Sequence, residues 1–494
     1  MKNLVKIVAV LQLFNALPLH GQFTMTPSWI KIDSSINHTS EAWGIDVDIN
    51  NDIYWAVSND QLGQGLDIVC YKYQLGGTPV WTSPITFGGA GDQHAYICNV
   101  VDSGLFIGGR ACPGLVMTCD MLLLKLDKNT GNLVWSKTNN FPANGYDEID
   151  GLEISNNSIY CGGWCQELNS SPYRNDIGLW KLDLDGNTEW TNYLGENLSA
   201  EHQDGHFVVD SNYIYAAGLW GGTGIANLYN GYSFLGKFDK SNGNLIDSTL
   251  FGHQSSSFGD VENALGMTSD GTYLYITGYT TITSVNDWQI YVAKYDKNLN
   301  QIWYTDWGGT GIESARAIKV QDSLIYVGGL TQSSSLITGG GIRDAVLLKL
   351  DTAGNFISYQ TFGDENDESF QDLAVHDGNI YITGTIESGL YESKSVLVAI
   401  EKTTTDIEDL HTNPQIQYTI YPNPATGEIH IEFDQSVESV RQINLYDLKG
   451  KLVKSKTIKE PFQQTLFEIE NKGVYLVELL FDTYRTARKI VNKN

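Results

Sequence analysis

A motif of about fifty residues that recurs along most of the chain is the strongest constraint on its fold. In its clearest copy, residues 303–355, a tryptophan is followed by a glycine-rich turn, Glu313, the apolar runs 324–329 and 344–351, and a closing Gly354. Each run is short, rich in Val, Ile, Leu and Tyr, and bounded by Gly, Asn or Asp, which is typical of β-strands joined by tight turns. The motif therefore predicts four strands per repeat.

Two landmarks define the period of the repeat. An aromatic residue in the second strand recurs at spacings of 51 to 60 residues, at Tyr54, Phe106, Tyr160, Tyr215, Tyr275, Tyr326 and Tyr381. A lysine in the third strand recurs in phase, at Lys72, Lys125, Lys181, Lys237, Lys294 and Lys349. Such a period is typical of a propeller blade, because a single small sheet buries its faces only when neighbouring sheets pack against it. We predict an all-β fold with a seven-bladed β-propeller over residues 22–402.

The ends of the repeat array predict how the propeller closes. The seventh unit ends with the third strand at residues 396–401 and lacks a fourth strand, whereas Trp29 to Ile32 resemble the start of one. We expect this N-terminal strand, near residues 29–32, to complete the last blade. That pairing would leave no open sheet edge at the seam.

Three segments of the repeat resemble the bacterial propeller repeat family known as SBBP. They are Gly308 to Ala315, Ile325 to Gly329 and Asp344 to Asp351, and the likeness extends over residues 29–402. It implies the propeller fold but no particular activity, because propellers host many unrelated functions.

Residues 1–21 have the pattern of a secretory signal peptide. Lys2 and Lys6 precede an apolar run at residues 7–13, and cleavage is expected before Gln22. A short membrane anchor is the alternative, but the run is shorter than the roughly 20 residues that a bilayer requires. No other segment is long and apolar enough, so we expect no transmembrane segment.

The charge of the chain is concentrated in the propeller. The formal net charge is −27; residues 411–494 carry 11 basic and 10 acidic side chains, which leaves 20 basic and 48 acidic side chains for residues 1–410. A surface this acidic repels phosphate backbones, so nucleic acid is not expected as a partner. Cations and neutral ligands are compatible with it.

The six cysteines lie between Cys70 and Cys165. Disulfides are permitted in an exported protein, and Cys112 and Cys119, at the two ends of one loop, are the favoured pair. Cys161 and Cys165 could close a second small loop, while Cys70 and Cys98 fall in strands and could be buried thiols. A zinc site is the alternative, although the spacing fits no common ligand pattern.

The C-terminal part of the chain has a different pattern. Residues 403–415 read as a linker, and residues 416–494 contain short alternating strands that predict a small Ig-like β-sandwich. Its landmarks are Tyr421, Pro422, Asn423, Pro424, Gly450, Gly473, Tyr475 and Lys489. In this order they resemble the type A sorting domain of the type IX secretion system of Bacteroidetes.

This resemblance implies a route and a partner. Such domains carry a folded periplasmic cargo across the outer membrane, so the type IX machinery is the expected partner. The expected location is secreted, or attached to the outer-membrane surface. The basic segment 485–493 could contact that machinery or could be a solvated edge strand.

One face of the propeller is expected to carry any function. The loop that enters each blade and the loop between its second and third strands open on the same face, because successive strands alternate in direction. The second group of loops varies in length and is rich in aromatic residues. The predicted ligand-binding residues are Trp164, Tyr173, Trp220, Tyr229, Tyr232, Trp288 and Tyr391.

The entering loops add carboxylates to this face: Asp92, Asp147, Asp260, Glu262, Glu313, Asp364, Glu365, Asp367 and Glu368. A ring of oxygen ligands could bind calcium, so a calcium ion is a possible ligand although no cofactor is expected. The alternative is that each carboxylate caps backbone N–H groups of its own or the next blade. A residue type that recurs in nearly every blade favours this second interpretation.

One cluster occurs in a single repeat. His202, Asp204 and His206 alternate along an expected strand, so their side chains would face the same way and could bind a metal ion. Motifs of serine hydrolases, phosphate-binding loops and zinc peptidases are absent from the sequence.

The leading hypothesis is a non-catalytic module that binds an extracellular glycan or protein, because tryptophan and tyrosine supply large rigid contact surfaces. A polysaccharide hydrolase or lyase that uses carboxylates of the loop face is the first alternative, since glycoside hydrolysis requires only two suitably spaced carboxyl groups. A structural surface component is the second. Blade-specific carboxylates deep in the channel would favour the enzyme.

Overall fold

The computed structural model of the protein divides into two compact units, Met1–Glu401 and Lys402–Asn494. The residues that the structure describes are 27–33, 39–60, 65–88, 91–114, 118–141, 145–167, 174–194, 201–202, 207–220, 230–252, 260–281, 287–337, 341–387, 392–401, 418–422, 425–437, 440–447, 452–457, 462–469, 471–481 and 485–493. The expected signal peptide (1–21) and linker (403–415) lie outside them. No helix within the described residues is long and apolar enough to span a membrane.

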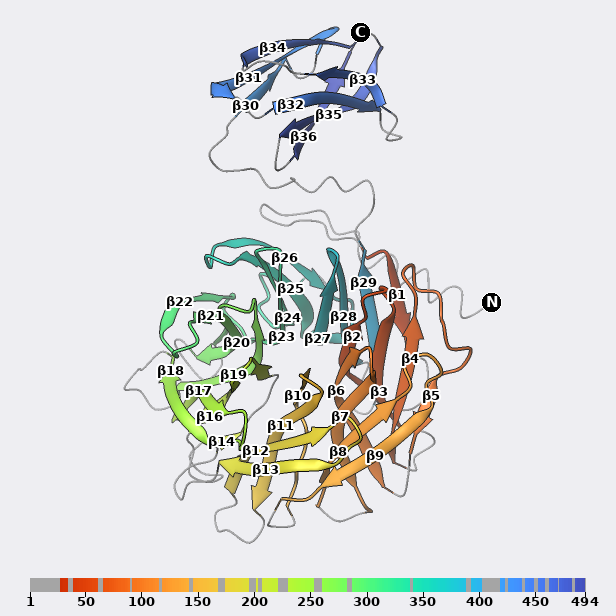
Figure 1. The fold of residues 1–494 in the computed structure, drawn as a ribbon, viewed down its shortest axis with the longest axis vertical. Helices are drawn as coiled ribbons and strands as arrows, with labels where there is room; N and C mark the ends of the chain where they lie inside the picture. The colour runs from red at the N-terminus through yellow and green to blue at the C-terminus, as the bar shows by residue number, and fades with distance from the viewer. Residues whose placement is uncertain are drawn as a thin grey trace. The chain divides into compact units, whose positions relative to one another are not determined.

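The first unit consists of antiparallel sheets that follow one another along the chain (Figure 1). The first two sheets comprise β2 (Ser40–Val47), β3 (Ile53–Asp60), β4 (Leu66–Tyr73) and β5 (Ile85–Phe87), then β6 (Asp92–Val101), β7 (Gly104–Cys112), β8 (Asp120–Leu126) and β9 (Leu133–Asn139). The next comprises β10 (Gly151–Ser155), β11 (Ser158–Glu167), β12 (Arg174–Asp183) and β13 (Thr188–Leu194).

The following strands form a larger hydrogen-bonded set. It contains β14 (Glu201–His202), β15 (Phe207–Val209), β16 (Tyr213–Trp220), β17 (Asn230–Asp239) and β18 (Leu245–Phe251), and then β19 (Asp260–Ser269), β20 (Leu274–Thr281), β21 (Trp288–Tyr295) and β22 (Gln301–Trp307). The two groups are joined by a short parallel contact between β17 and β19, whereas all their other pairings are antiparallel.

Two further sheets complete the unit. One contains β23 (Glu313–Gln321), β24 (Leu324–Thr331), β25 (Asp344–Asp351) and β26 (Phe356–Phe362), and the other contains β27 (Asp367–His376), β28 (Asn379–Glu387), β29 (Ser393–Ile400) and β1 (Trp29–Ile32). The first strand of the chain therefore pairs with the last strand of the unit, with Trp29 opposite Ala399. The Trp29 indole also donates a hydrogen bond to the Glu401 carboxylate at 2.7 Å.

The innermost strands form a closed ring. Going round it, β2, β6, β10, β15, β19, β23 and β27 each contact the next, and β27 contacts β2. Sheets packed radially around a central channel make a β-propeller (Figure 1). The ring is what positions any residue that lines the channel.

The recurring lysine joins neighbouring sheets. Its ammonium donates to a carbonyl oxygen in a turn of the following sheet, as in the pairs Lys72 to Lys128, Lys125 to Leu184, Lys237 to Lys297 and Lys294 to Thr352. The tryptophans that begin the outer strands donate to the same turns, as Trp135 does to Leu184 and Trp303 to Thr352. The recurring lysine and the recurring tryptophan therefore both stabilise contacts between sheets.

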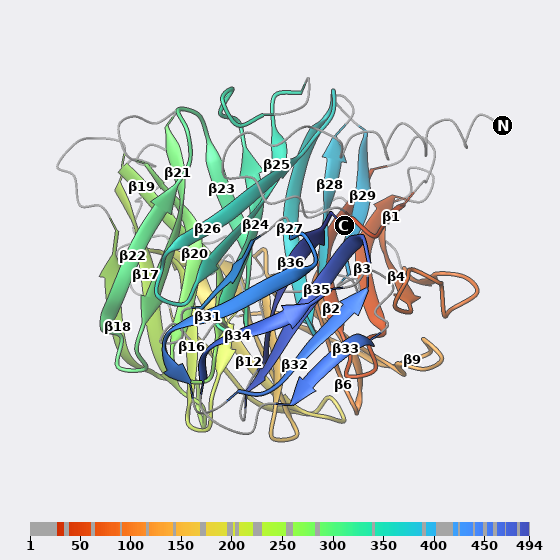
Figure 2. The same cartoon turned by 90° about the horizontal axis from the view of Figure 1, so that it is seen from above.

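The second unit contains two sheets that share one core. The first comprises β30 (Tyr418–Tyr421), β31 (Glu428–Val437) and β34 (Phe462–Glu468), and the second comprises β33 (Leu452–Thr457), β32 (Val440–Asp447), β35 (Gly473–Phe481) and β36 (Arg485–Asn492), which lie side by side in Figure 2. Buried apolar residues from both sheets, including Ile429, Ile431, Ile443, Phe467 and Val477, form the core. Alternation of buried and exposed positions along these strands produces the two layers.

Candidate functional site

The three described tryptophans of the loop face each pack against another ring. Trp164, Trp220 and Trp288 are half-buried at the same edge of successive sheets. Their ring centroids lie 5.4 Å from Tyr146, 5.5 Å from Phe234 and 4.3 Å from Tyr279, respectively. Tyr232 lies across from Trp220 and is 38% exposed. Tyr173, Tyr229 and Tyr391 lie outside the described residues.

Several carboxylates of the entering loops accept backbone hydrogen bonds. Glu313 is fully buried and accepts from the Gly309 and Ser333 N–H groups and from the hydroxyls of Thr331 and Ser333. Asp92, Asp147 and Asp367 accept from backbone N–H groups in the same way. These contacts fit the interpretation of this carboxylate set as backbone caps.

The innermost strands carry a bulge at one equivalent position. The pairing register shifts at Trp43 in β2, Tyr96 in β6, Leu265 in β19, Arg316 in β23 and Gln371 in β27. A bulge leaves one residue unpaired and redirects its side chain. Because these residue types differ, the bulges give the channel a different side chain from each of these five strands.

Three of these bulge positions lie in contact around the channel. The Arg316 guanidinium lies 4.9 Å from the ring centroid of Trp43, and Trp43 meets Tyr96 edge to face at 5.7 Å. Because β27 lies between β23 and β2 in the ring, Arg316 reaches past a whole sheet to make this contact. All three side chains are half-buried, so part of each remains accessible to solvent.

Arg110 extends this chain of contacts to the next sheets. Its guanidinium lies 5.2 Å from the ring of Tyr96 and 4.4 Å from the ring of Tyr146, and it forms a 2.7 Å ion pair with Glu148. Tyr146 in turn packs on Trp164. We call Trp43, Tyr96, Tyr146, Trp164, Arg110 and Arg316 the channel cluster.

Charged neighbours perturb the titration of groups in this cluster. Burial and the adjacent Arg110 lower the pKa of His94 to about 4, so His94 is neutral at pH 7. Burial and the nearby Glu148 raise the pKa of Tyr96 well above its usual value, so its hydroxyl stays protonated. The cluster therefore offers aromatic surface and two guanidinium groups, with the neutral His94 imidazole beside Arg110.

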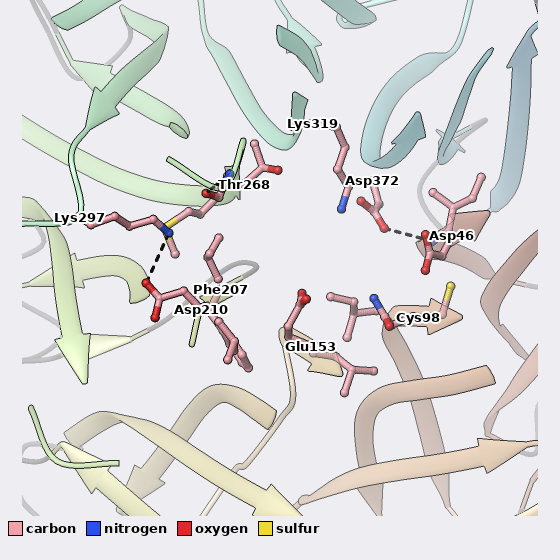
Figure 3. Close-up of a pocket in the computed structure, with 18 residues that line it drawn as sticks. Asp46, Cys98, Glu153, Phe207, Asp210, Thr268, Lys297, Lys319 and Asp372 are labelled. Atoms are coloured by element: carbon pink, nitrogen blue, oxygen red, sulfur yellow. Dashed lines mark hydrogen bonds and ion pairs between the residues drawn. The ribbon is translucent and has the colours of Figure 1, made fainter. Parts of the chain in front are cut away.

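A cavity of about 390 Å³ lies further along the channel (Figure 3). It is lined in part by residues paired directly with the recurring aromatic of six sheets: Asp46, Asn99, Glu153, Val208, Thr268 and Lys319. Asp372, Asp210 and Lys297 also line it. The carboxylates are specific to particular sheets, because the equivalent positions elsewhere carry neutral or basic residues.

The carboxyl groups of the cavity differ in their partners. Asp46 accepts from the backbone N–H of Val100 at 2.7 Å, and Asp372 accepts from that of Ile45 at 3.1 Å, so each also ties neighbouring inner strands together. For Glu153 and Lys319, no hydrogen bond or ion pair is found among the described residues. Lys297 lies 3.9 Å from Asp210.

Burial dominates the titration of these acids. It raises the pKa of Glu153 and of Asp372 to about 7, and the neighbouring Lys319 ammonium partly opposes the shift in both. Burial likewise raises the pKa of Asp46, again opposed by Lys319. The cavity can therefore hold a proton near neutral pH.

The remaining sequence predictions fall partly outside the described residues. Asp204 and His206 lie outside them, and the side chain of His202 is not described. The part of the chain that the structure describes contains no group of three or more His, Cys, Asp or Glu side chains arranged to hold a metal ion. Cys112 and Cys119 form a disulfide, and Cys70, Cys98, Cys161 and Cys165 are buried free thiols.

Most of the described landmarks of the second unit lie at or near its strand ends. Tyr421 ends β30 and is followed by a cis peptide bond to Pro422. Gly473 and Tyr475 begin β35, and Lys489 lies on β36 opposite Leu476. The Tyr475 hydroxyl donates to the Asn471 carbonyl oxygen at 2.9 Å. Asn423, Pro424 and Gly450 lie outside the described residues.

Comparison with known proteins identifies the second unit. Residues 419–493 match the family described as the secretion system C-terminal sorting domain. The match supports export by the type IX secretion system and a protein that is secreted or attached to the cell surface. No curated protein matches the chain.

Several solved structures resemble the chain at low identity. The β-propeller domain of the Trilobed protease from Pyrococcus furiosus is 11% identical, with 74% of this chain and 97% of that chain covered and a TM-score of 0.42. Drosophila Semaphorin 1b, extracellular domains 1-2, is 7% identical, with 79% of this chain and 90% of that chain covered and a TM-score of 0.43. The phage phi92 endosialidase is 11% identical, with 93% of this chain and 88% of that chain covered and a TM-score of 0.42.

Proposed function

We propose that the protein is an exported β-propeller that binds an extracellular glycan at the channel cluster without chemical conversion of the ligand. The observation that carries this proposal is the continuous series of ring and guanidinium contacts from Arg316 through Trp43, Tyr96, Arg110 and Tyr146 to Trp164. Aromatic faces pack against the C–H surfaces of sugars, and the polar edges of such rings can bond to hydroxyl groups. Half-burial holds the rings in place before the ligand arrives, which reduces the entropy lost on binding.

The architecture proposed for this module is a seven-bladed propeller of SBBP-type repeats. The closed ring of inner strands and the recurrence of the lysine contacts between sheets support that number of blades. The pairing of β1 with β29 supports closure by the N-terminal strand.

The route proposed for export begins with a signal peptide at residues 1–21 and passes through the periplasm of a member of the Bacteroidetes. The second unit then acts as an Ig-like sorting domain of type A that contacts the type IX machinery. The family match over residues 419–493 supports this role.

Binding can be tested with the mature chain from Gln22 and a panel of soluble neutral polysaccharides. Depletion of the protein with the polymer is scored together with the appearance of new reducing or unsaturated ends. We expect retention without new ends. Trp43→Ala and Tyr96→Ala should each weaken retention at least tenfold, because each removes a ring from the channel cluster.

Trp288→Ala is the matched control, because Trp288 packs on Tyr279 in a sheet outside the channel cluster. If Trp288→Ala abolishes retention while Trp43→Ala leaves it intact, the site is the outer loop face and the channel cluster is not the glycan site. No retention of any polymer contradicts glycan binding and favours a protein ligand or a structural role.

Hydrolysis or lysis of a polysaccharide is the second candidate, and one observation favours it. Glu153 and Asp372 are sheet-specific, lie in the channel and have pKa values raised to about 7, which suits proton transfer at neutral pH. New ends that disappear in Glu153→Gln would establish this alternative.

A further inference from the structure

The cavity further along the channel contains a pair of opposite charges that the glycan proposal does not use. Lys319 and Glu153 come from β23 and β10 and point toward one another from two sides of the cavity (Figure 3). Both are half-buried. Neither side chain has a hydrogen bond or an ion pair with any described residue, so the two charged groups lie in the same cavity without a direct ion pair.

The other charged groups of the cavity already have partners. Asp46 and Asp372 accept backbone hydrogen bonds, and Lys297 lies beside Asp210 at the other side of the cavity. The ammonium of Lys319 and the carboxyl of Glu153 are therefore the charged groups of the cavity without a hydrogen bond or an ion pair to a described residue. Burying such groups is costly unless a partner satisfies them.

Two neutral side chains extend this surface. Asn99 and Thr268 occupy the equivalent register positions on β6 and β19 and also line the cavity. Neither side chain has a hydrogen bond to a described residue. Together the four side chains present one cation, one acid, one amide and one hydroxyl to the same volume.

We propose that this cavity binds a small zwitterion of the amino-acid class. The ligand carboxylate would bind the Lys319 ammonium, and the ligand ammonium would bind the Glu153 carboxylate. The volume of about 390 Å³ lies within the roughly 300–1,000 Å³ typical of small-ligand sites. This site is separate from the channel cluster and does not depend on glycan binding.

The charge pattern disfavours simpler ligands. An anion would benefit from Lys319 but would also face the carboxyl groups of Asp46, Glu153 and Asp372, whereas a cation or metal ion would be repelled by Lys319. A zwitterion provides a partner for both the Lys319 ammonium and the Glu153 carboxylate, and it adds no net charge to a buried site.

Binding should depend on pH through Glu153. The charged groups that face it are Lys319 on β23, Asp46 on β2 and Lys240, which follows β17. Burial raises the pKa of Glu153 to about 7, and a bound ammonium would lower it by stabilising the carboxylate. Affinity should therefore fall as the pH drops below 7 and level off above it, with release of a proton on binding near pH 7.

Titration calorimetry on the full mature chain tests this site with glycine, β-alanine and γ-aminobutyrate, which differ in the separation of their charges. Propionate and propylamine serve as singly charged counterparts. We expect at least one zwitterion to bind, and its singly charged counterparts to bind at least tenfold more weakly. Lys319→Met and Glu153→Gln should each reduce the affinity at least tenfold, because each removes a charged hydrogen-bond partner.

Lys297→Met is the matched control, because Lys297 lines the same cavity but is beside Asp210. It should leave the affinity within about twofold, and Lys319→Arg should restore part of what Lys319→Met loses. The proposal fails if no zwitterion binds, if the singly charged compounds bind equally well, or if both Lys319→Met and Glu153→Gln retain wild-type affinity. Polysaccharide retention by the same variants is measured in parallel, so failure of this site and failure of the glycan site are told apart.

Discussion

The Lys72 ammonium donates a hydrogen bond to the Lys128 carbonyl oxygen at 3.1 Å, which joins the first sheet of the propeller to a turn of the second. The same ammonium forms a 2.9 Å ion pair with Asp52 and lies 4.9 Å from the ring of Tyr54. The side chain of Lys72 is 4% exposed. A lysine that recurs in six of the repeats is thus a structural element of the contact between sheets.

Replacement of this lysine should destabilise the propeller. Lys72→Met keeps most of the apolar stem but leaves Asp52 and the Lys128 carbonyl without their cation, so we expect the free energy of unfolding to fall by about 2–4 kcal/mol. Urea-induced unfolding measures the change. Lys394→Met, at a half-buried lysine of β29 with no hydrogen bond to a described residue, is the control and should change stability by less than about 1 kcal/mol. Equal losses in the two variants would contradict the structural role of Lys72.

The seam between the two ends of the propeller should depend on Trp29. Its ring lies 6.0 Å from Tyr73 and 6.2 Å from Tyr381, and its indole donates to Glu401. Trp29→Ala removes all three contacts, and we expect a loss of about 2–4 kcal/mol in the free energy of unfolding.

Hydrogen exchange locates the effect of this change. The amides of β29 that pair with β1 should exchange faster in Trp29→Ala than in the wild type, whereas those of β25 should be unchanged. Uniform acceleration in both strands would show that the loss is global and not confined to the seam.

Glu313 should stabilise its loop without calcium. The carboxylate is fully buried and accepts four hydrogen bonds from Gly309, Thr331 and Ser333. In Glu313→Gln the side-chain NH2 replaces one acceptor oxygen and therefore faces a hydrogen-bond donor. We expect a loss of about 2–3 kcal/mol. Thermal unfolding with calcium and with a chelator should give the same difference between variant and wild type. A difference that vanishes in chelator would instead assign this carboxylate to a calcium site.

Much of the architecture could be read from the sequence because it is repeated. Tyr54, Lys72 and their counterparts recur since each sheet makes the same contact with the next, and repetition separates such positions from the background. The β1 strand was detectable for the same reason. Trp29 begins the fourth strand of a sheet whose other three strands come from the C-terminal end of the first unit. A contact that is repeated between successive sheets requires the same residue type at the same position of each repeat.

The channel site was harder to predict because its residues do not repeat. Trp43, Tyr96 and Arg316 share a bulge position but no side-chain chemistry, and Arg316 meets Trp43 only because the ring brings β23 and β2 within reach. Trp164 was identified from its loop, yet its partners were not. One signal was available: the residue seven or eight positions before six of the recurring aromatics, such as Glu153 before Tyr160, lines the cavity.

The stability of the protein should decrease as the pH rises from 5 to 8, and Glu153 should account for part of this change. Its pKa is about 7 in the folded protein, against an ordinary value of 4.5, so the folded state binds a proton more tightly than the unfolded state does. The stabilising contribution is therefore complete below pH 4.5 and is lost as the pH rises through 7. Burial also raises the pKa of Asp372 to about 7, which contributes in the same direction.

We expect Glu153→Gln to match the wild type at pH 5 and to exceed its free energy of unfolding by about 2 kcal/mol at pH 8, because the amide avoids the buried charge. Urea unfolding at the two pH values measures this difference, with the exposed Glu365→Gln as a control that should follow the wild type at both. Parallel pH profiles for Glu153→Gln and the wild type would show that Glu153 ionises in the folded channel at no cost.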